Sequence, residues 1–407
     1  MVIPHAGSGG STAGAAVPSQ LSAGRRRRRK VPRAALALIL PIAAASMING
    51  GVAEAASPQW RVVPGTTLGP HGSGLVEVAA TGPQDAWAVG YACTVEKHVP
   101  CPAIARWNGV QWKNATMPAY RFPAGYDSDI YTFDAVSAAS GNDVWVVGNG
   151  RNVRVGHWNG GSWSMYRPFG VAENYQLSDV EVARGRVWFA GTTSDDRGII
   201  LSWNGRAGFT SESVHNGTLA AVSARSRTGE IWAVGHSRNT DGPLVVRGTG
   251  KAGAMDWREI SVPATPEGSL TQVWPISADD VWAIGHIGVG PRGDLTISQP
   301  LVLHYDGRSW SRVPLPVKKG RLTGVTADAS GDIWVAGIDA SHPKQALFLR
   351  RSRGRWSATY GPDFRFGEVR GVSITRIPGS NGMWAVGRDG DGDGGSDGEK
   401  TTILRYG

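Results

Sequence analysis

The stretch DDVWAIGH, Asp279–His286, decides the fold because close variants of it recur from residue 85 to the end of the chain. Each variant contains a tryptophan followed three residues later by a glycine, and successive tryptophans lie 43 to 58 residues apart. Self-similarity at such a period predicts a repeat architecture, in which each repeat is one small supersecondary unit. The tryptophans of the motif are Trp87, Trp145, Trp188, Trp232, Trp282, Trp334 and Trp384.

The motif has the composition of a strand that is covered on both faces. Side chains alternate along a strand, so Val281 and Ala283 share one face with Gly285, and Trp282 and Ile284 share the other. Neither face carries the polar residues of a solvated sheet surface. One face is small and the other is large, so the large face of one copy fits the small face of the next. A ring of such sheets is a β-propeller.

Short apolar segments before the motif and Asn-Gly or Asp-Gly turns after it complete a four-stranded repeat, because such turns favour tight hairpins. The last repeat ends at Gly407, after its third strand, whereas QWRVVP at Gln59–Pro64 matches the fourth-strand segment SWSRVP at Ser309–Pro314. We therefore expect an all-β fold, a seven-bladed β-propeller of four-stranded blades. Its ring is closed by the N-terminal strand, Gln59 to Pro64, which completes the last blade and covers its edge.

The first 55 residues have the pattern of a signal peptide. The basic run Arg25–Lys30 precedes the apolar segment Ala34–Met47, and the small-residue site Ala53–Ala55 follows. We expect residues 1–55 to be removed and residues 56–407 to form the propeller as one domain. The protein is then secreted and extracellular, with no membrane span after cleavage.

The net charge of the full chain, +9, comes mostly from the same N-terminal segment. Residues 56–407 contain 35 Lys and Arg against 32 Asp and Glu, a net charge of +3. A chain with such a balanced charge lacks the strongly basic surface that supports nucleic-acid binding. We therefore expect no nucleic-acid partner.

The repeats resemble the secreted bacterial β-propellers of the kelch, galactose-oxidase central-domain and Asp-box type. The segments DGRSW at Asp306–Trp310 and NGGSW at Asn159–Trp163 are similar to the end of an Asp-box, although its leading Ser and Asp are missing. The kelch double glycine is also missing, and no residue set matches the copper site of galactose oxidase or the arginine triad of sialidases. The resemblance therefore implies a fold and assigns no activity.

Candidate ligand-binding residues fall in two places. The loops after the motif share one face of a propeller, and His236 and His286 directly follow the motif glycine in adjacent repeats. The first strands line the central channel, where Glu181 and Trp274 stand out among smaller residues. A purely structural role is the alternative for all four. The aligned channel position reads Ala79, Ser137, Glu181, Ser223, Trp274, Thr326 and Ser373.

These features favour a non-enzymatic extracellular binding module, monomeric, which recognises a protein or a glycan through the loop face. The alternative is a secreted hydrolase or lyase with its active site on the loop face or at the channel mouth. In that case His236, His286 and Glu181 are the candidate acid and base groups. The ligand or substrate itself is not identified by the sequence.

Cys93 and Cys101 are the only cysteines of the chain, and both lie in one loop. Export delivers the chain to an oxidising compartment, where paired cysteines form disulfides. We therefore expect a Cys93–Cys101 disulfide.

The segment DGDGDGGSD, Asp389–Asp397, is similar to the D-x-D-x-D-G-x-x-D loop of FG-GAP propeller repeats, and this resemblance implies bound calcium. Ca²⁺ takes about six to eight oxygen ligands, and glycines allow alternate carboxylates to converge on it. We expect a structural calcium ion here. The alternative is a solvated Gly/Asp hairpin tip without a metal. The candidate ligands are Asp389, Asp391, Asp393 and Asp397.

Overall fold

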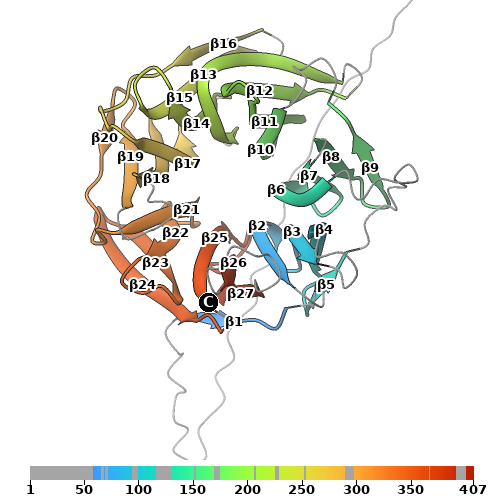
Figure 1. The fold of residues 1–407 in the computed structure, drawn as a ribbon. Coiled ribbons are helices and arrows are strands. Elements are labelled where there is room, and N and C mark those ends of the chain that lie inside the picture. Colours follow the sequence, from blue (N-terminus) through green and yellow to red (C-terminus); the bar gives the residue numbers. More distant parts are fainter. Residues whose placement is uncertain are drawn as a thin grey trace, which may run out of the picture. The chain divides into compact units, whose positions relative to one another are not determined.

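The computed structural model describes residues 58–407 except 66–67, 69–71, 94–99, 116–129, 151–152, 169–174, 206–207, 225–228, 252–253, 289–297, 366 and 391–399. Its sheets are arranged as a ring around a central opening (Figure 1). The all-β propeller expected from the repeat is therefore confirmed. In the part of the chain that the structure describes, no helix has the length and apolar character needed to cross a membrane.

Five of the sheets have four strands each, joined in antiparallel order. One contains β2 (Ser73–Gly82), β3 (Asp85–Cys93), β4 (Pro100–Trp107) and β5 (Trp112–Asn114), and the next contains β6 (Ile130–Ser140), β7 (Asp143–Gly150), β8 (Arg154–Trp158) and β9 (Trp163–Tyr166). A third contains β17 (Gly268–Ser277), β18 (Asp280–Ile287), β19 (Gln299–Tyr305) and β20 (Trp310–Arg312), and a fourth contains β21 (Gly320–Ala327), β22 (Ile333–Asp339), β23 (Gln345–Ser352) and β24 (Arg355–Asp363). The fifth contains β25 (Glu368–Arg376), β26 (Met383–Gly390), β27 (Lys400–Tyr406) and β1 (Trp60–Val62).

The sixth sheet departs from the expected pattern because it has seven strands. Its fourth strand is 15 residues long and pairs with one neighbour through residues 209–217 and with the other through residues 217–223. The expected count of seven separate four-stranded blades is therefore not confirmed. The strands are β10 (Tyr175–Ala183), β11 (Arg186–Thr193), β12 (Arg197–Trp203), β13 (Phe209–Ser223), β14 (Ile231–Ser237), β15 (Gly242–Lys251) and β16 (Ala254–Glu259).

The ring closes where the two ends of the described chain meet. Strand β1 is antiparallel to β27, with Trp60 opposite Tyr406, as expected from the match between the N-terminal segment and a fourth strand. The indole of Trp60 is 7% exposed and stacks on Phe348 of the neighbouring sheet, with 3.7 Å between ring centres. Trp60 therefore joins the last two sheets as well as completing one of them.

The apolar core is divided into clusters that lie between successive sheets. Trp282 and Ile284 pack against Ile333 and Val335 of the next sheet, so the large face of one motif covers the small face of the following one, as expected. A cluster of the same kind joins Trp188 in the first half of the seven-stranded sheet to Ala233 and other residues in the second half. Both faces of most second strands are thus buried against neighbouring repeats.

The motif glycine is required by a close backbone approach. In the innermost strands a β-bulge interrupts the pairing near this glycine, as between Leu270 and Gln272 opposite β18. A Cβ atom built on Gly285 would lie 1.9 Å from the carbonyl oxygen of Ser269, and one on Gly235 would lie 1.9 Å from that of Thr218. No side chain fits at such a distance, so the bulge explains why the repeat always ends in glycine.

An Arg or His side chain of the third strand covers most motif tryptophans of its own repeat. The guanidinium carbons of Arg106, Arg247, Arg350 and Arg405 lie 4.5 to 5.2 Å from the indole centres, within the range of cation–π contact. In the other two cases His157 and His304 stack on the indole at 4.2 Å. These two histidines therefore belong to the scaffold.

The acidic residue two positions before the tryptophan holds this Arg or His side chain in place. Asp280, for example, accepts hydrogen bonds from the Trp282 indole at 2.7 Å and from His304 at 2.9 Å. We call the acid, the tryptophan and the Arg or His side chain together the indole triad. Matching pairs are Asp85–Arg106, Asp143–His157, Glu230–Arg247 and Asp332–Arg350.

The third repeat reverses the charges of this arrangement. Arg186 lies two positions before Trp188, where other repeats have Asp or Glu. Ser202 is opposite Trp188 on the third strand, where other repeats have Arg or His. Glu212 of β13 supplies the acid, 3.5 Å from the Arg186 guanidinium, and accepts a hydrogen bond from Ser202. The repeat thus keeps an ion pair beside the indole while exchanging the strands that carry it.

Candidate functional site

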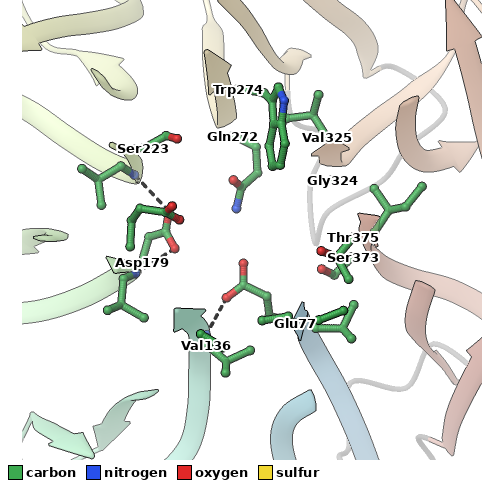
Figure 2. Close-up of a pocket in the computed structure, with 18 of the residues that line it drawn as sticks. Glu77, Val136, Asp179, Ser223, Gln272, Trp274, Gly324, Val325, Ser373 and Thr375 are labelled. Carbon is green, nitrogen blue, oxygen red and sulfur yellow. Dashed lines mark hydrogen bonds between the residues drawn. The ribbon is translucent and has the colours of Figure 1, made fainter. Parts of the chain in front are cut away.

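A cavity of about 400 Å³ lies on the axis of the ring, where the innermost strands of the sheets converge (Figure 2). Its wall contains both channel residues singled out from the sequence, Glu181 of β10 and Trp274 of β17. Glu181 is 7% exposed, and Trp274 is half-buried with its indole against the apolar cluster behind it. The structure thus brings Glu181 and Trp274 to one cavity.

The strand register tests the alignment of the channel position. Glu181 and Trp274 are each paired with the motif tryptophan of the adjacent strand, and so are Ala79, Ser137, Ser223 and Thr326. In the last repeat, however, the residue opposite Trp384 is Thr375 rather than Ser373. The sequence alignment placed Ser373 at the channel because it follows Val372. In β25, however, the bulge lies between Val369 and Gly371, so Val372 is opposite Gly387 and the residue opposite Trp384 comes later in the strand.

Two further carboxylates in the cavity wall, Glu77 and Asp179, were not predicted from the sequence. Both lie two residues before the channel position and are labelled in Figure 2. Glu77 Oε2 accepts the backbone N–H of Val136 at 2.7 Å, and Asp179 Oδ2 accepts that of Val222 at 2.9 Å. Each carboxylate is thereby fixed to the next repeat. The sequence did distinguish these two carboxylates, because other repeats have Ala135, Ala221 or Gly324 at the same position.

The cavity wall combines acidic groups with neutral hydrogen-bonding groups and one aromatic ring. Gln272 occupies the position of Glu77 and Asp179 in its own repeat, and its amide points toward the centre of the cavity in Figure 2. Such a wall suits a ligand that donates hydrogen bonds or carries a cationic group, and that offers a flat face to the indole of Trp274.

His236 has a structural contact that also occurs in other repeats. Its Nδ1 lies 3.0 Å from the carbonyl oxygen of Gly268 in the next sheet. At the same position of their repeats, Asn149 bonds to the backbone of Leu177, and Thr192 accepts the N–H of Leu219. These contacts tie one repeat to the next and account for His236 without a ligand.

His286 follows the same glycine but has different surroundings. It is paired with Ser269 and Pro300 at the end of β18, and Arg321 lies near it. Burial, reinforced by the positive charge of Arg321, lowers the pKa of His286 below its usual value. The imidazole is therefore neutral at pH 7.

The three groups proposed for acid and base catalysis have separate surroundings. His236 contacts Gly268 and lies 3.5 Å from Asp241, His286 is beside Arg321, and Glu181 is in the wall of the axial cavity. In the described part of the chain, none of the hydrogen bonds or ion pairs of the two histidines joins them to each other or to Glu181. The hydrolase alternative thus has no assembled acid–base set among these residues.

The predicted disulfide joins residues of β3 and β4, and most of the predicted calcium segment lies outside the described residues. Cys101 is paired with Ala92 and Cys93 with Pro100, so the cysteines are not directly opposite, and the side chain of Cys93 is not described. Asp391, Asp393 and Asp397 also lie outside the described residues, whereas Asp389 is fully buried in β26. No group of three or more potential ligands is present among the described residues. Both the disulfide and the calcium site stay predictions.

Comparisons with known proteins agree on the fold. No protein-family model matches the chain, and no curated protein matches its sequence. Among solved structures, YCF48 bound to D1 peptide has a TM-score of 0.54 and 17% identity, over 85% of this chain and 96% of that one. The WD40 β-propeller domain of Doa1 has a TM-score of 0.54 and 9% identity, over 85% and 96%. They show a β-propeller.

A third similar structure belongs to an enzyme, the GH74 xyloglucanase from Xanthomonas campestris. The TM-score is 0.54 and the identity 14%, over 81% of this chain and 53% of the enzyme. At these identities the similarities establish the fold and carry no activity to this chain. Membership of the kelch or galactose-oxidase families stays a prediction.

Proposed function

We propose that this protein is a non-enzymatic binding module whose ligand enters the axial cavity. The observation that carries this proposal is the side-chain set at the cavity wall. Positions where the scaffold tolerates Ala, Ser, Thr or Gly carry Glu77, Asp179, Glu181, Gln272 and Trp274 instead. Large and polar side chains at positions that packing leaves small are typical of a binding site.

The chemistry of the wall favours a segment of an extracellular protein or a glycan. Carboxylates and the Gln272 amide accept or exchange hydrogen bonds with ammonium, amide or hydroxyl groups, and the Trp274 indole offers a face for a cation or a sugar ring. Binding of a peptide has precedent in this architecture, because the similar structure of YCF48 contains a D1 peptide.

The number of repeats bears on the shape of the proposed axial site. We infer that the seven-stranded sheet represents two repeats that share β13, which gives seven repeats in the ring. The support is that β13 changes partners at Gly217 and that an apolar cluster separates the two halves of this sheet, like the clusters between other sheets. Seven motif tryptophans agree with this count.

We also propose that binding takes place outside the cell and that the segment Asp389–Asp397 holds calcium. The first proposal rests on the signal-peptide pattern of residues 1–55, and the second on the alternating carboxylates of that segment. A monomer is sufficient for binding, because the proposed site lies on the axis of a single ring.

The test is a ligand screen with a variant that restores the small residues of the repeat. The secreted protein is applied to glycan and peptide arrays, alongside Glu181→Ser/Trp274→Ser. Ser137 and Ser223 occupy the same position in other repeats, so the variant is expected to fold and to lose the ligand. Arg258→Gln changes an exposed pair with Asp256 and serves as the control. Equal binding by the serine variant and the wild type would refute an axial site.

A further inference from the structure

A second group of polar side chains gathers on one rim of the ring, outside the wall of the axial cavity. His286 ends β18, Arg321 begins β21, Arg370 lies in the bulge of β25, and Arg388 is near the end of β26. Ser269 is paired with His286, and Gly371 is paired with Arg388. The first strand of each repeat therefore begins on the same rim on which the second strand ends. We call these four residues the cationic rim.

One hydrogen bond connects two members of the cationic rim across sheets, and Arg388 has neighbours in two further strands. Arg321 Nη2 donates a hydrogen bond to the carbonyl oxygen of Arg370 at 2.7 Å. The Arg388 guanidinium lies 6.0 Å from the ring centre of Tyr91 and is close enough to Asp134 to interact with its charge. The described part of the rim thus combines three guanidinium groups from two neighbouring sheets with the charge of Asp134 near one of them.

Two buried nitrogen atoms of the cationic rim have no hydrogen-bond partner in the described part of the chain. Nδ1 of His286 and Nε of Arg321 are both buried and have no hydrogen-bond partner among the described residues. A buried N–H without an acceptor is costly, and natural structures keep such groups rarely. The two atoms belong to residues of neighbouring sheets, His286 in β18 and Arg321 in β21, on the same rim of the ring.

The charges of the cationic rim oppose one another. Burial lowers the pKa of Arg321, and Arg388 and Arg370 lower it further. Burial and the charge of Arg321 have the same effect on the pKa of His286. Like charges held together in a partly buried place are stabilised when an anion binds among them.

We propose that His286, Arg321, Arg370 and Arg388 form a binding site for an oxyanion, a carboxylate or a phosphate group of a ligand. Guanidinium groups bind both oxyanions through paired N–H donors. A bound anion accepts a hydrogen bond from Arg321 Nε, and from His286 Nδ1 in the tautomer or charge state that carries a proton there, and it offsets the repulsion between the arginines. The site is separate from the axial cavity and does not depend on the function proposed for it.

The experiment titrates the secreted protein with inorganic phosphate and, separately, with succinate, against chloride at matched ionic strength. Thermal melting and the NMR resonance of His286, assigned with His286→Gln, are followed. Binding to the folded state is expected to raise the melting temperature in a saturable way and to raise the pKa of His286. A response to phosphate alone assigns a phosphate ligand, and a response to succinate assigns a carboxylate.

The matched variants are Arg321→Gln and Arg258→Gln. Arg321→Gln is expected to weaken anion binding at least about tenfold, because it removes a charged donor from the centre of the site. Arg258→Gln, in the exposed pair with Asp256, is expected to bind like the wild type. An equal response of both variants, or a His286 resonance in the wild type that neither anion moves, would overturn the proposal. The second readout is measured on the wild type, and His286→Gln serves only to assign the resonance.

Discussion

The indole triads and the wall of the axial cavity are built on the same repeat but follow opposite rules. In the triads the partners change while the interaction persists, since Arg, His and even a reversed ion pair cover the tryptophan. At the cavity wall the position opposite the motif tryptophan is kept in each repeat, but its side chain changes, from Ala79 to Glu181 to Trp274. Conservation of an interaction within the repeat thus marks the scaffold, and departure from the repeat marks the candidate site.

The largest effect expected from breaking the scaffold is at Trp60. Trp60→Ala removes a buried indole that stacks on Phe348 across two sheets, and it should cost roughly 3–5 kcal/mol in unfolding free energy. Val62 on the same strand is 53% exposed, so Val62→Ala is the control and should change stability little. Urea unfolding of both variants measures the difference. Similar losses in the two would mean that β1 contributes through its backbone alone.

The next effect concerns the motif glycine. Gly285→Ala places a methyl group against the Ser269 carbonyl and should cost about 1–3 kcal/mol, as for other overpacked sites. Gly82 has no atom within 4 Å of its built Cβ, and Gly82→Ala should be nearly neutral. Thermal melts compare the pair. A neutral Gly285→Ala would show that the bulge relaxes readily and that glycine has another role.

A smaller effect is expected at the indole triads. Glu230→Gln weakens the ion pair with Arg247 beside Trp232, in a half-buried setting, and should cost about 1–2 kcal/mol. Asp256→Asn weakens the exposed pair with Arg258 and should cost less than about 1 kcal/mol. If denaturant unfolding gives equal values for the two, the triad adds no more than an ordinary surface ion pair.

The smallest effect is a pH dependence that belongs to the rim rather than the scaffold. The pKa of His286 is lower in the folded state than in the unfolded state, where it is about 6.5, so the unfolded state takes up the proton first. Stability contributed by neutral His286 is present above pH 6.5 and decreases as the pH falls through the two pKa values. His286→Asn should therefore lose less stability than the wild type between pH 7.5 and 5.5.

Melting curves in buffers without phosphate or carboxylate measure this difference, since either anion would complicate the comparison. Identical losses in His286→Asn and the wild type would mean that the shift of this pKa is too small to affect folding.

The sequence was sufficient for the features that repeat. Seven copies of one motif predicted the sheet ring, and the match of Gln59–Pro64 to a fourth strand predicted the β1–β27 pairing. It was not sufficient for long-range choices. The shared β13 depends on where the chain after β12 turns, and the role of Asp280 depends on the imidazole of His304, which lies 24 residues away in the sequence.

The candidate site was predicted only in part, for a related reason. Glu181 and Trp274 were visible because one aligned column departs from small residues, whereas Glu77 and Asp179 required a second column. The cationic rim was visible only in part, because His286 and Arg388 share the position after the motif glycine, whereas Arg321 and Arg370 occupy two other positions of their repeats. Their proximity results from the bulges and from the order of the sheets around the ring.

The pairing of β1 with β27 has a consequence for the time course of folding. Strand β1 precedes its partner β27 by almost the whole described chain, so Trp60 cannot reach its final position until both segments have been synthesised. Until then the edge of the last sheet is also without its fourth strand. The slowest folding step should therefore be closure of the ring, which requires contact between segments more than 300 residues apart. The sequence of β1 then determines how long an unclosed, aggregation-prone intermediate persists.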